Sequence, residues 1–208
     1  MTHHATGITV VGRGSADATP DMARVDLGVS VRADKMAEAT LIARDRAAAL
    51  ISALQAKGIP STDIATAGFS VYPEYDHQDG RQRLLGYRVN NDLQVVLRDL
   101  PTSGDVLDAA LGAAGDESTV NGFALSLTDD TPARDAAREA AWEDARRRAE
   151  HLASLAGRSL GAVVSVVETG GGSPPPRPMM RTAMAESTPI EPGTQSITVI
   201  VEVRFDLG

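Results

Sequence analysis

The stretch that most constrains the fold is residues 131–157, TPARDAAREAAWEDARRRAEHLASLAG, which predicts one long helix. Thr131 is a suitable N-cap, Pro132 fits the first turn because its missing N–H has no partner there, and Gly157 tolerates the left-handed turn that ends many helices. Apolar residues recurring at steps of three or four predict one buried face: Ala137, Ala141, Ala145, Ala149, Leu152 and Ala156. Because this face is almost entirely alanine, we expect the helix to lie close to whatever it covers.

The rest of this helix is charged. Glu143 and Arg147, like Asp144 and Arg148, have the four-residue spacing that suits ion pairs. The arginine triplet 146–148 is a candidate phosphate site, but the carboxylates around it favour a solvated helix face. Trp142 is expected at the border of the buried face, with its indole N–H reaching a partner. The next residues, LGAVVSVVE, predict a strand, so the helix covers a sheet.

Alternating apolar and polar residues predict the remaining strands. They lie near residues 7–18, 24–32, 69–75, 87–98, 123–127, 163–168 and 197–205. Because one face of each strand is polar and therefore expected to be solvent-exposed, the pattern favours antiparallel pairing. In the strand at 87–98, Asn91 interrupts the inward apolar row, which indicates either the rim of the core or a bulge. Gly12 and Gly14 in the first strand lack the third glycine and the following helix of a dinucleotide loop, so close packing or a bulge is the favoured interpretation.

Two further helices are predicted. The first runs from a cap at Asp34 to about Lys57, and Gly58, Ile59 and Pro60 end it. Its expected buried stripe is Met36, Ala39 or Ala43, Ala47, Leu50 and Leu54. A short helix follows at 103–114 and ends at Gly115.

These elements predict an α+β fold with two long helices and one short helix on one face of a largely antiparallel sheet. The order strand, helix, strand, strand occurs in residues 22–98 and again in 119–206, which indicates a duplicated unit. We expect a single domain over residues 1–208, carrying a Pro/Gly/Met-rich loop at 170–194. Loops of that length are often functional or disordered.

Composition narrows the function. A net charge of −8 argues against nucleic-acid and anionic-membrane partners, and the absence of cysteine excludes disulfides and thiolate metal ligands. No apolar run approaches the ~20 residues of a membrane-spanning helix. The first residues lack the basic start and apolar stretch of a secretory signal. As written, the sequence predicts a cytoplasmic protein, or a periplasmic or exported one if a signal was removed.

No residues stand out as catalytic, cofactor-binding or metal-binding. The segment 74–79, EYDHQD, is the one cluster of oxygen and nitrogen ligands, and without the spacing of a calcium loop it is better interpreted as a solvated hairpin tip within 76–83. His151, on the long helix, is expected to have a solvent-edge or packing role and not a catalytic one. No serine lies in a G-x-S-x-G elbow. Met179, Met180 and Met184 in the loop suggest a partner-binding or soft-metal patch, or simply a loop that carries methionines.

Motifs spread along the chain in a fixed order resemble the SIMPL-domain family, long described as a domain of unknown function. They are Val11-Gly12-x-Gly14, Pro20-Asp21-x-Ala23, Gly58-Ile59, Asp63-Ile64-x-Thr66, Tyr72-Pro73-x-Tyr75, Gly86-Tyr87, Asp144-Ala145-Arg146, Ala149-Glu150-x-Leu152-Ala153, Ala156-Gly157, Leu160-Gly161 and Thr188-Pro189-Ile190-x-Pro192-Gly193. The resemblance implies a non-enzymatic fold that self-assembles. Some members of the family are exported antigens that form large channel-like homo-oligomers, another is similar to an adaptor that binds a kinase, and bacterial members are linked with stress tolerance.

Two classes of function therefore remain. The first is an assembly or interaction protein whose partners are itself, as a homo-oligomer, and an unidentified protein, with the 170–194 loop in contacts between chains. The second is a small-ligand-binding or enzymatic protein that uses a cleft between helices and sheet. A deep polar pocket with convergent ionisable groups would favour the second class.

Overall fold

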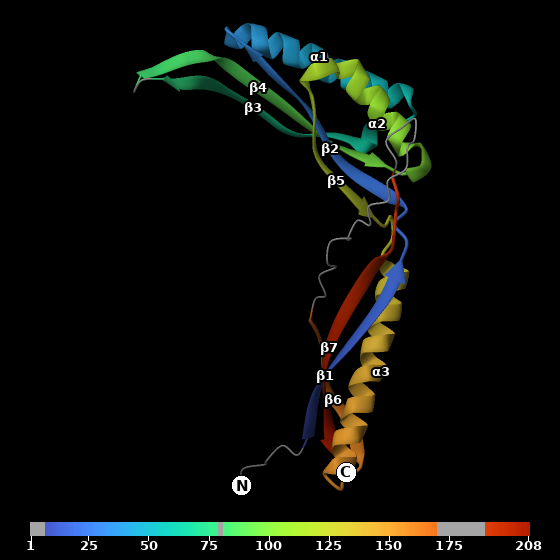
Figure 1. Ribbon diagram of the computed structural model, residues 1–208. Helices are drawn as coiled ribbons and strands as arrows, with labels where there is room; N and C mark the ends of the chain where they lie inside the picture. The colour runs from blue at the N-terminus through green and yellow to red at the C-terminus, as the bar shows by residue number, and fades with distance from the viewer. Residues whose placement is uncertain (1–6, 79–80, 170–189) are drawn as a thin grey trace. The chain divides into compact units, whose positions relative to one another are not determined.

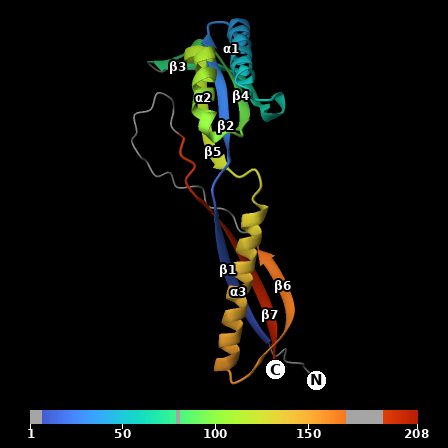
Figure 2. The same cartoon turned by 90° about the vertical axis from the view of Figure 1, so that its right-hand side faces the viewer.

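The computed structural model describes residues 7–78, 81–169 and 190–208 (Figures 1 and 2). Its elements are β1 (Gly7–Ala18), β2 (Met22–Ala33), α1 (Met36–Ala56), the 3-10 turn η1 (Ser61–Asp63), β3 (Ile64–Gln78), β4 (Arg81–Leu97), α2 (Leu100–Ala114), the 3-10 turn η2 (Gly115–Glu117), β5 (Ser118–Ser126), α3 (Thr131–Leu155), β6 (Leu160–Thr169) and β7 (Gln195–Leu207). All strand pairs among these residues are antiparallel. The predicted α+β class is confirmed.

The strands form two sheets where the sequence analysis expects one. The first sheet has the order β1-β7-β6 and is covered by α3, whereas the second has the order β3-β4-β2-β5 and is covered by α1 and α2. The chain divides into two compact units accordingly. The predicted second repeat, 119–206, does not form one sheet, because β5 pairs with β2 and β1 takes the place beside β7. Alternation within a strand identifies its buried face but not its neighbour.

In the first unit, α3 lies over β1 and β7 (Figure 2), and it buries a row of alanines against them. Ala137, Ala141, Ala145 and Ala149 are buried as predicted, but the row ends at Ala153. Leu152 is 44% exposed and Ala156 is also exposed, so both were predicted wrongly. A row with a constant step of four residues is inclined to the helix axis. The helix therefore crosses its sheet obliquely, and the Leu152 side is turned away from it.

Gly12 and Gly14 are the positions where β1 touches the backbone of α3. A Cβ on Gly12 would lie 2.1 Å from the carbonyl oxygen of Ala141, and one on Gly14 would lie 2.2 Å from that of Ala137. Between them, the backbone N–H of Arg13 donates to Asp144 (3.1 Å). This hydrogen bond is the largest cause of the lowered pKa of Asp144. The close-packing interpretation of the two glycines is confirmed.

The ends and ion pairs of α3 differ from the prediction in detail. Asp130 is the N-cap residue, one position before Thr131, and the Asp129 carboxylate accepts from the Thr131 backbone N–H (2.9 Å). Gly157 has a φ of 67°, and its N–H donates to the Ser154 carbonyl (3.0 Å), as a left-handed C-terminal turn requires. The Asp144–Arg148 pair is present at 2.9 Å. Arg147 binds Asp144 (2.7 Å) instead of the predicted Glu143.

In the second unit, α1 buries Ala39, Ala43, Ala47, Leu50 and Leu54 against β2 and β4. Two details of the predicted helix are wrong. Met36 is 53% exposed. The N-cap residue is Lys35 and no side chain caps the helix, so Asp34 does not do so. The predicted end is confirmed, because Gly58 has a φ of 90° and the Ile59 N–H donates to the Leu54 carbonyl (3.1 Å).

Asn91 lies at the rim of the core of the second unit. It keeps the regular β2–β4 register opposite Val29, and its neighbour on β3 is Phe69, which is 58% exposed. The nearest register shift is in β3, between Thr66 and Gly68. Its Oδ1 atom is buried without a hydrogen-bond partner among the described residues. Of the two predicted alternatives, the structure therefore has the rim.

Asp63 gives the second unit an acid-sensitive contact. Its side chain is 8% exposed and accepts two hydrogen bonds from Arg98, at 2.7 and 2.8 Å. The hydrogen bonding to Arg98 is the main cause that lowers the pKa of Asp63 in the folded protein. Stability from this contact is therefore complete above the unfolded carboxyl pKa of about 3.9 and is lost as the pH falls towards the lower, folded value.

We expect Asp63→Asn to unfold at lower urea concentration than the parent at pH 7, with a gap that narrows between pH 5 and pH 2. The gap narrows because protonation removes the same charge from the parent. Urea unfolding followed by circular dichroism at each pH measures it. Asp45→Asn is the control, since the Asp45 side chain is 64% exposed. A gap that stays constant with pH would contradict the assignment.

Candidate functional site

Strand β6 is an open edge of the first sheet. Among the described residues it pairs with β7 alone. Four of its ten residues, Val163, Val164, Val166 and Val167, are valines that are 44–52% exposed. Natural proteins usually protect an edge of this kind with charges, bulges or a covering segment, because its free N–H and C=O groups accept another strand. β6 is therefore the most exposed apolar strand edge of this unit.

The face of β6 on the helix side is bare for a geometric reason. A helix about 10 Å wide covers roughly two strands spaced about 4.8 Å apart. α3 lies over β1 and β7 and barely touches β6. The register places Val163 opposite Phe205 and Val166 opposite Val203, and these β7 partners are buried beneath α3. Val163 and Val166 thus face the helix side without being covered by it.

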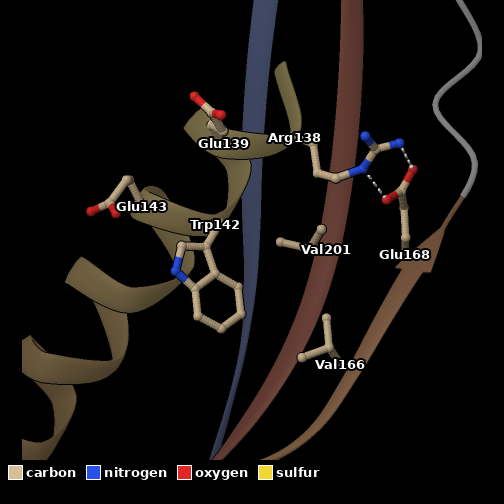
Figure 3. Close-up of a pocket in the computed structure, with 7 residues that line it drawn as sticks. All are labelled: Arg138, Glu139, Trp142, Glu143, Val166, Glu168 and Val201. Carbon is tan, nitrogen blue, oxygen red and sulfur yellow. Dashed lines mark hydrogen bonds and ion pairs between the residues drawn. The ribbon is translucent and has the colours of Figure 1, made fainter. Parts of the chain in front are cut away.

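The uncovered space between α3 and β6 is a pocket of about 460 Å³ (Figure 3). We call it the Trp142 trough. It is lined by Arg138, Glu139, Trp142, Glu143, Val166, Glu168 and Val201. The Trp142 ring packs against Phe205 with centroids 6.4 Å apart. Trp142 lies at the border of the buried face as predicted, and the partner expected for its indole N–H is not among the described residues of this chain.

The charges of the Trp142 trough are unevenly paired. Arg138 binds Glu168 of β6 (2.7 Å) and also pairs with Asp135. The hydrogen bond from Arg138 lowers the pKa of Glu168, so this carboxyl is held ionised. Glu139 and Glu143 lie one helical turn apart on the α3 side, and neither has a cation within 4 Å in the part of the chain that the structure describes. The trough therefore combines an apolar floor with an acidic helix side.

The second unit carries a projecting arm. The β2–β4 pairing ends at Ala33 and Tyr87, whereas the β3–β4 pairing continues to Gln78 and Arg81 (Figure 1). Residues 74–78 and 81–86 thus form a two-stranded arm with a free β4 edge. Two-stranded hairpins are marginally stable alone in water. Glu74 anchors the base of the arm, where Arg88 donates to it and Arg32 pairs with it at 3.6 Å.

Of the predicted ligand cluster at 74–79, only Glu74, Tyr75 and Asp76 have described side chains. Glu74 is engaged by Arg88, and the hydrogen bond from Arg88 lowers its pKa. In the predicted hairpin at 76–83, the described residues are strand up to Gln78 and again from Arg81, and residues 79–80 lie outside the described residues. Within the described ranges, no group of three His, Cys, Asp or Glu side chains is arranged to hold a metal ion.

The remaining sequence candidates are not part of the trough. His151 and the arginines 146–148 are exposed on α3, as expected of a solvated face. Residues 170–189 of the predicted 170–194 loop, with Met179, Met180 and Met184, lie outside the described residues. Sequence analysis missed the trough and the β6 edge. Its one signal was the run VVSVV, which in an ordinary sheet marks a strand buried on both faces.

A known protein family matches this chain over a range that includes both units. The model of the SIMPL family, described as "Protein of unknown function (DUF541)", matches residues 8–205. The chain belongs to the SIMPL family. The resemblance drawn from the ordered motifs is thereby confirmed. The family description names no activity, so it shows neither catalysis nor its absence.

Two relatives illustrate how far the SIMPL similarity extends. "Uncharacterized protein YggE" of Escherichia coli K12 is 36% identical over 199 residues, which cover 96% of this chain and 79% of the relative. The "26 kDa periplasmic immunogenic protein" of Brucella melitensis is 32% identical over 224 residues, covering 100% of this chain and 87% of the relative. Among the described residues of this SIMPL protein, no helix is long and apolar enough to cross a membrane.

Proposed function

We propose that this SIMPL protein is a non-enzymatic, self-assembling protein and that β6 is a contact between copies. The observation that carries the proposal is the row of four half-exposed valines on an open strand edge. Apolar patches that a monomer leaves in water commonly mark protein interfaces. An added strand would satisfy the free backbone groups of β6 and cover its valines together.

The features of the Trp142 trough favour its interpretation as an interaction surface and not as a ligand-binding or catalytic cleft. Its floor is apolar, and Arg138 and Glu168 bind each other across one end. A carboxyl with a lowered pKa is not poised to exchange a proton near neutral pH. Glu139 and Glu143 are exposed. The trough is therefore not the deep polar pocket with convergent ionisable groups that would have favoured the ligand-binding or enzymatic class.

We expect Val167→Lys to lower the mass of the assembly measured by light scattering and sedimentation velocity at micromolar concentration. A lysine on an edge strand opposes strand addition because its charge would be buried in the interface. Val120→Lys is the matched control, since Val120 on β5 is also 51% exposed but belongs to the other sheet. A monomeric parent would refute self-assembly. An unchanged Val167→Lys variant would refute the β6 contact.

The 170–194 segment is a second proposed contact between chains. Its sequence carries Met179, Met180 and Met184, together with prolines that restrict the backbone. Ile190, at the end of the segment, packs against the core of the second unit and does not support this contact. We expect deletion of residues 173–186 to reduce the assembled mass. If the deletion variant keeps the assembly state of the parent, the segment is only a connector.

The compartment and physiological role belong to the same proposal. The Brucella relative is named as periplasmic, which supports an exported location over the cytoplasmic one expected from the sequence as written. Fractionation of the native host with an antibody against this protein tests the location. A role in stress tolerance or in the cell envelope stays a prediction of the family resemblance, as does a single domain over residues 1–208.

A further inference from the structure

We propose that the strand added to β6 is the free β4 edge of the arm from a second copy, residues 81–84. This inference rests on the proposed self-assembly and names the two surfaces that meet. One is β6 with the Trp142 trough, in the first unit. The other is the arm of the second unit, belonging to the next copy. Each surface has exposed apolar side chains and charged side chains without an ion pair among the described residues. The charges on the two surfaces are of opposite sign.

The backbones of both surfaces are open. On β6, the side away from β7 has no strand partner among the described residues. On β4, pairing with β2 stops at Tyr87, so within the described part of the chain the segment before it is paired on its β3 side only. Arg32 donates to the Leu85 carbonyl (3.5 Å) and occupies the edge there. Residues 81–84 are thus the portion of β4 left to form ladder hydrogen bonds with a new strand.

The apolar side chains match on the sheet face away from α3. Val167 is 51% exposed and lies opposite Glu202, which places it on that face. Leu84 of the arm is 44% exposed. Because successive strand residues point to opposite faces, Leu84 beside Val167 puts Arg83 on the face of the trough. Neighbouring apolar side chains on adjacent strands stabilise a sheet.

The charges match on the trough face. Among the described residues, neither Glu139 nor Glu143 has an ion pair within 4 Å, although Glu143 interacts electrostatically with Arg146. The exposed Arg83 also forms no ion pair with a described residue. Its register partner Asp76 is on the same arm, without an ion pair between them in the structure. Glu139 and Glu143 line the helix side of the trough, but their exposed side chains point away from β6 in Figure 3, so they must turn toward the added strand to meet Arg83. Partial desolvation strengthens such an attraction relative to an exposed pair.

The two surfaces are different patches of one chain, so the contact is heterologous. Repeated heterologous contacts give a closed ring or an open filament, according to whether the rotation between copies closes. Each copy uses its β6 edge once and its arm once. This geometry makes a charge-exchange experiment possible, because every interface in a uniform sample then carries both changes.

We expect Arg83→Glu alone, and Glu139→Arg/Glu143→Arg alone, to weaken assembly at least about tenfold in dissociation constant, which is roughly 1.4 kcal/mol. Combining all three changes in one chain should restore assembly to within about threefold of the parent, since opposite charges again meet. Sedimentation velocity over a concentration series measures this. Arg24→Glu is the matched control, an exposed arginine of the same unit, and should leave assembly unchanged.

Trp142 provides a second measurement because it is the only tryptophan in the chain. Its emission should shift to shorter wavelength as the parent assembles, and in Arg83→Glu the same shift should need at least about tenfold higher protein concentration. Failure of the triple variant to recover, or assembly of Arg83→Glu at parent strength, overturns the arm contact. If the arm contact fails in this way but Val167→Lys still lowers the assembled mass, self-assembly through β6 remains supported with a different partner strand. A monomeric parent refutes the proposed function itself.

Discussion

Replacing Gly12 by alanine is expected to lower the free energy of unfolding by about 3 kcal/mol, the largest effect among the substitutions considered. The added Cβ would lie 2.1 Å from the Ala141 carbonyl oxygen and 2.6 Å from the Ala145 backbone nitrogen. Both are backbone atoms of α3, so no side-chain rotation relieves the overlap. The helix would have to move off the sheet, and the packing of its whole alanine row would loosen.

Gly112→Ala is the matched control for this substitution. Gly112 lies inside α2, and a Cβ there meets nothing within 4 Å. Alanine is the better helix former, so we expect the control to gain about 0.5–1 kcal/mol. Urea unfolding monitored by circular dichroism measures both variants. A Gly12→Ala variant as stable as the parent would mean that α3 does not rest on β1 at this point.

Ala145→Leu is expected to lower the free energy of unfolding by about 1–3 kcal/mol through overpacking. Ala145 is 0% exposed. Its own Cβ would lie only 2.7 Å from a Cβ on Gly12, so the strand beneath it has no room for a larger side chain. The three additional heavy atoms of leucine must displace α3 or adopt a strained rotamer.

Ala140→Leu tests the same change on the other side of the helix. Ala140 is exposed, so a leucine there extends into solvent and we expect a change within about 0.5 kcal/mol. The urea midpoints of the two variants and the parent decide the question. Equal midpoints for Ala145→Leu and the parent would show that the buried face of α3 has been assigned wrongly.

Much of the local structure was determined by the sequence. The four-residue spacing of Ala137, Ala141, Ala145 and Ala149 identified the buried face of α3, because each element must turn its apolar side to a core. Gly58 and Gly157 marked helix ends because a positive φ strains residues that have a Cβ. Alternation located the strands and their antiparallel character. These features depend on neighbours along the chain, which the sequence shows directly.

The partners of the strands were decided only by the tertiary structure. Nothing in the alternating pattern of β5 distinguishes β2 from β6 or β7 as its neighbour, so one sheet was expected where two are present. The tertiary structure also decided that Ala153 is buried and Leu152 is not. The direction in which the strands cross beneath α3 determines whether the buried row continues from Ala149 by four residues or by three. The open edge of β6 and the Trp142 trough follow from these pairings. An interaction surface of this kind is made of what remains uncovered after packing, and local sequence does not specify that.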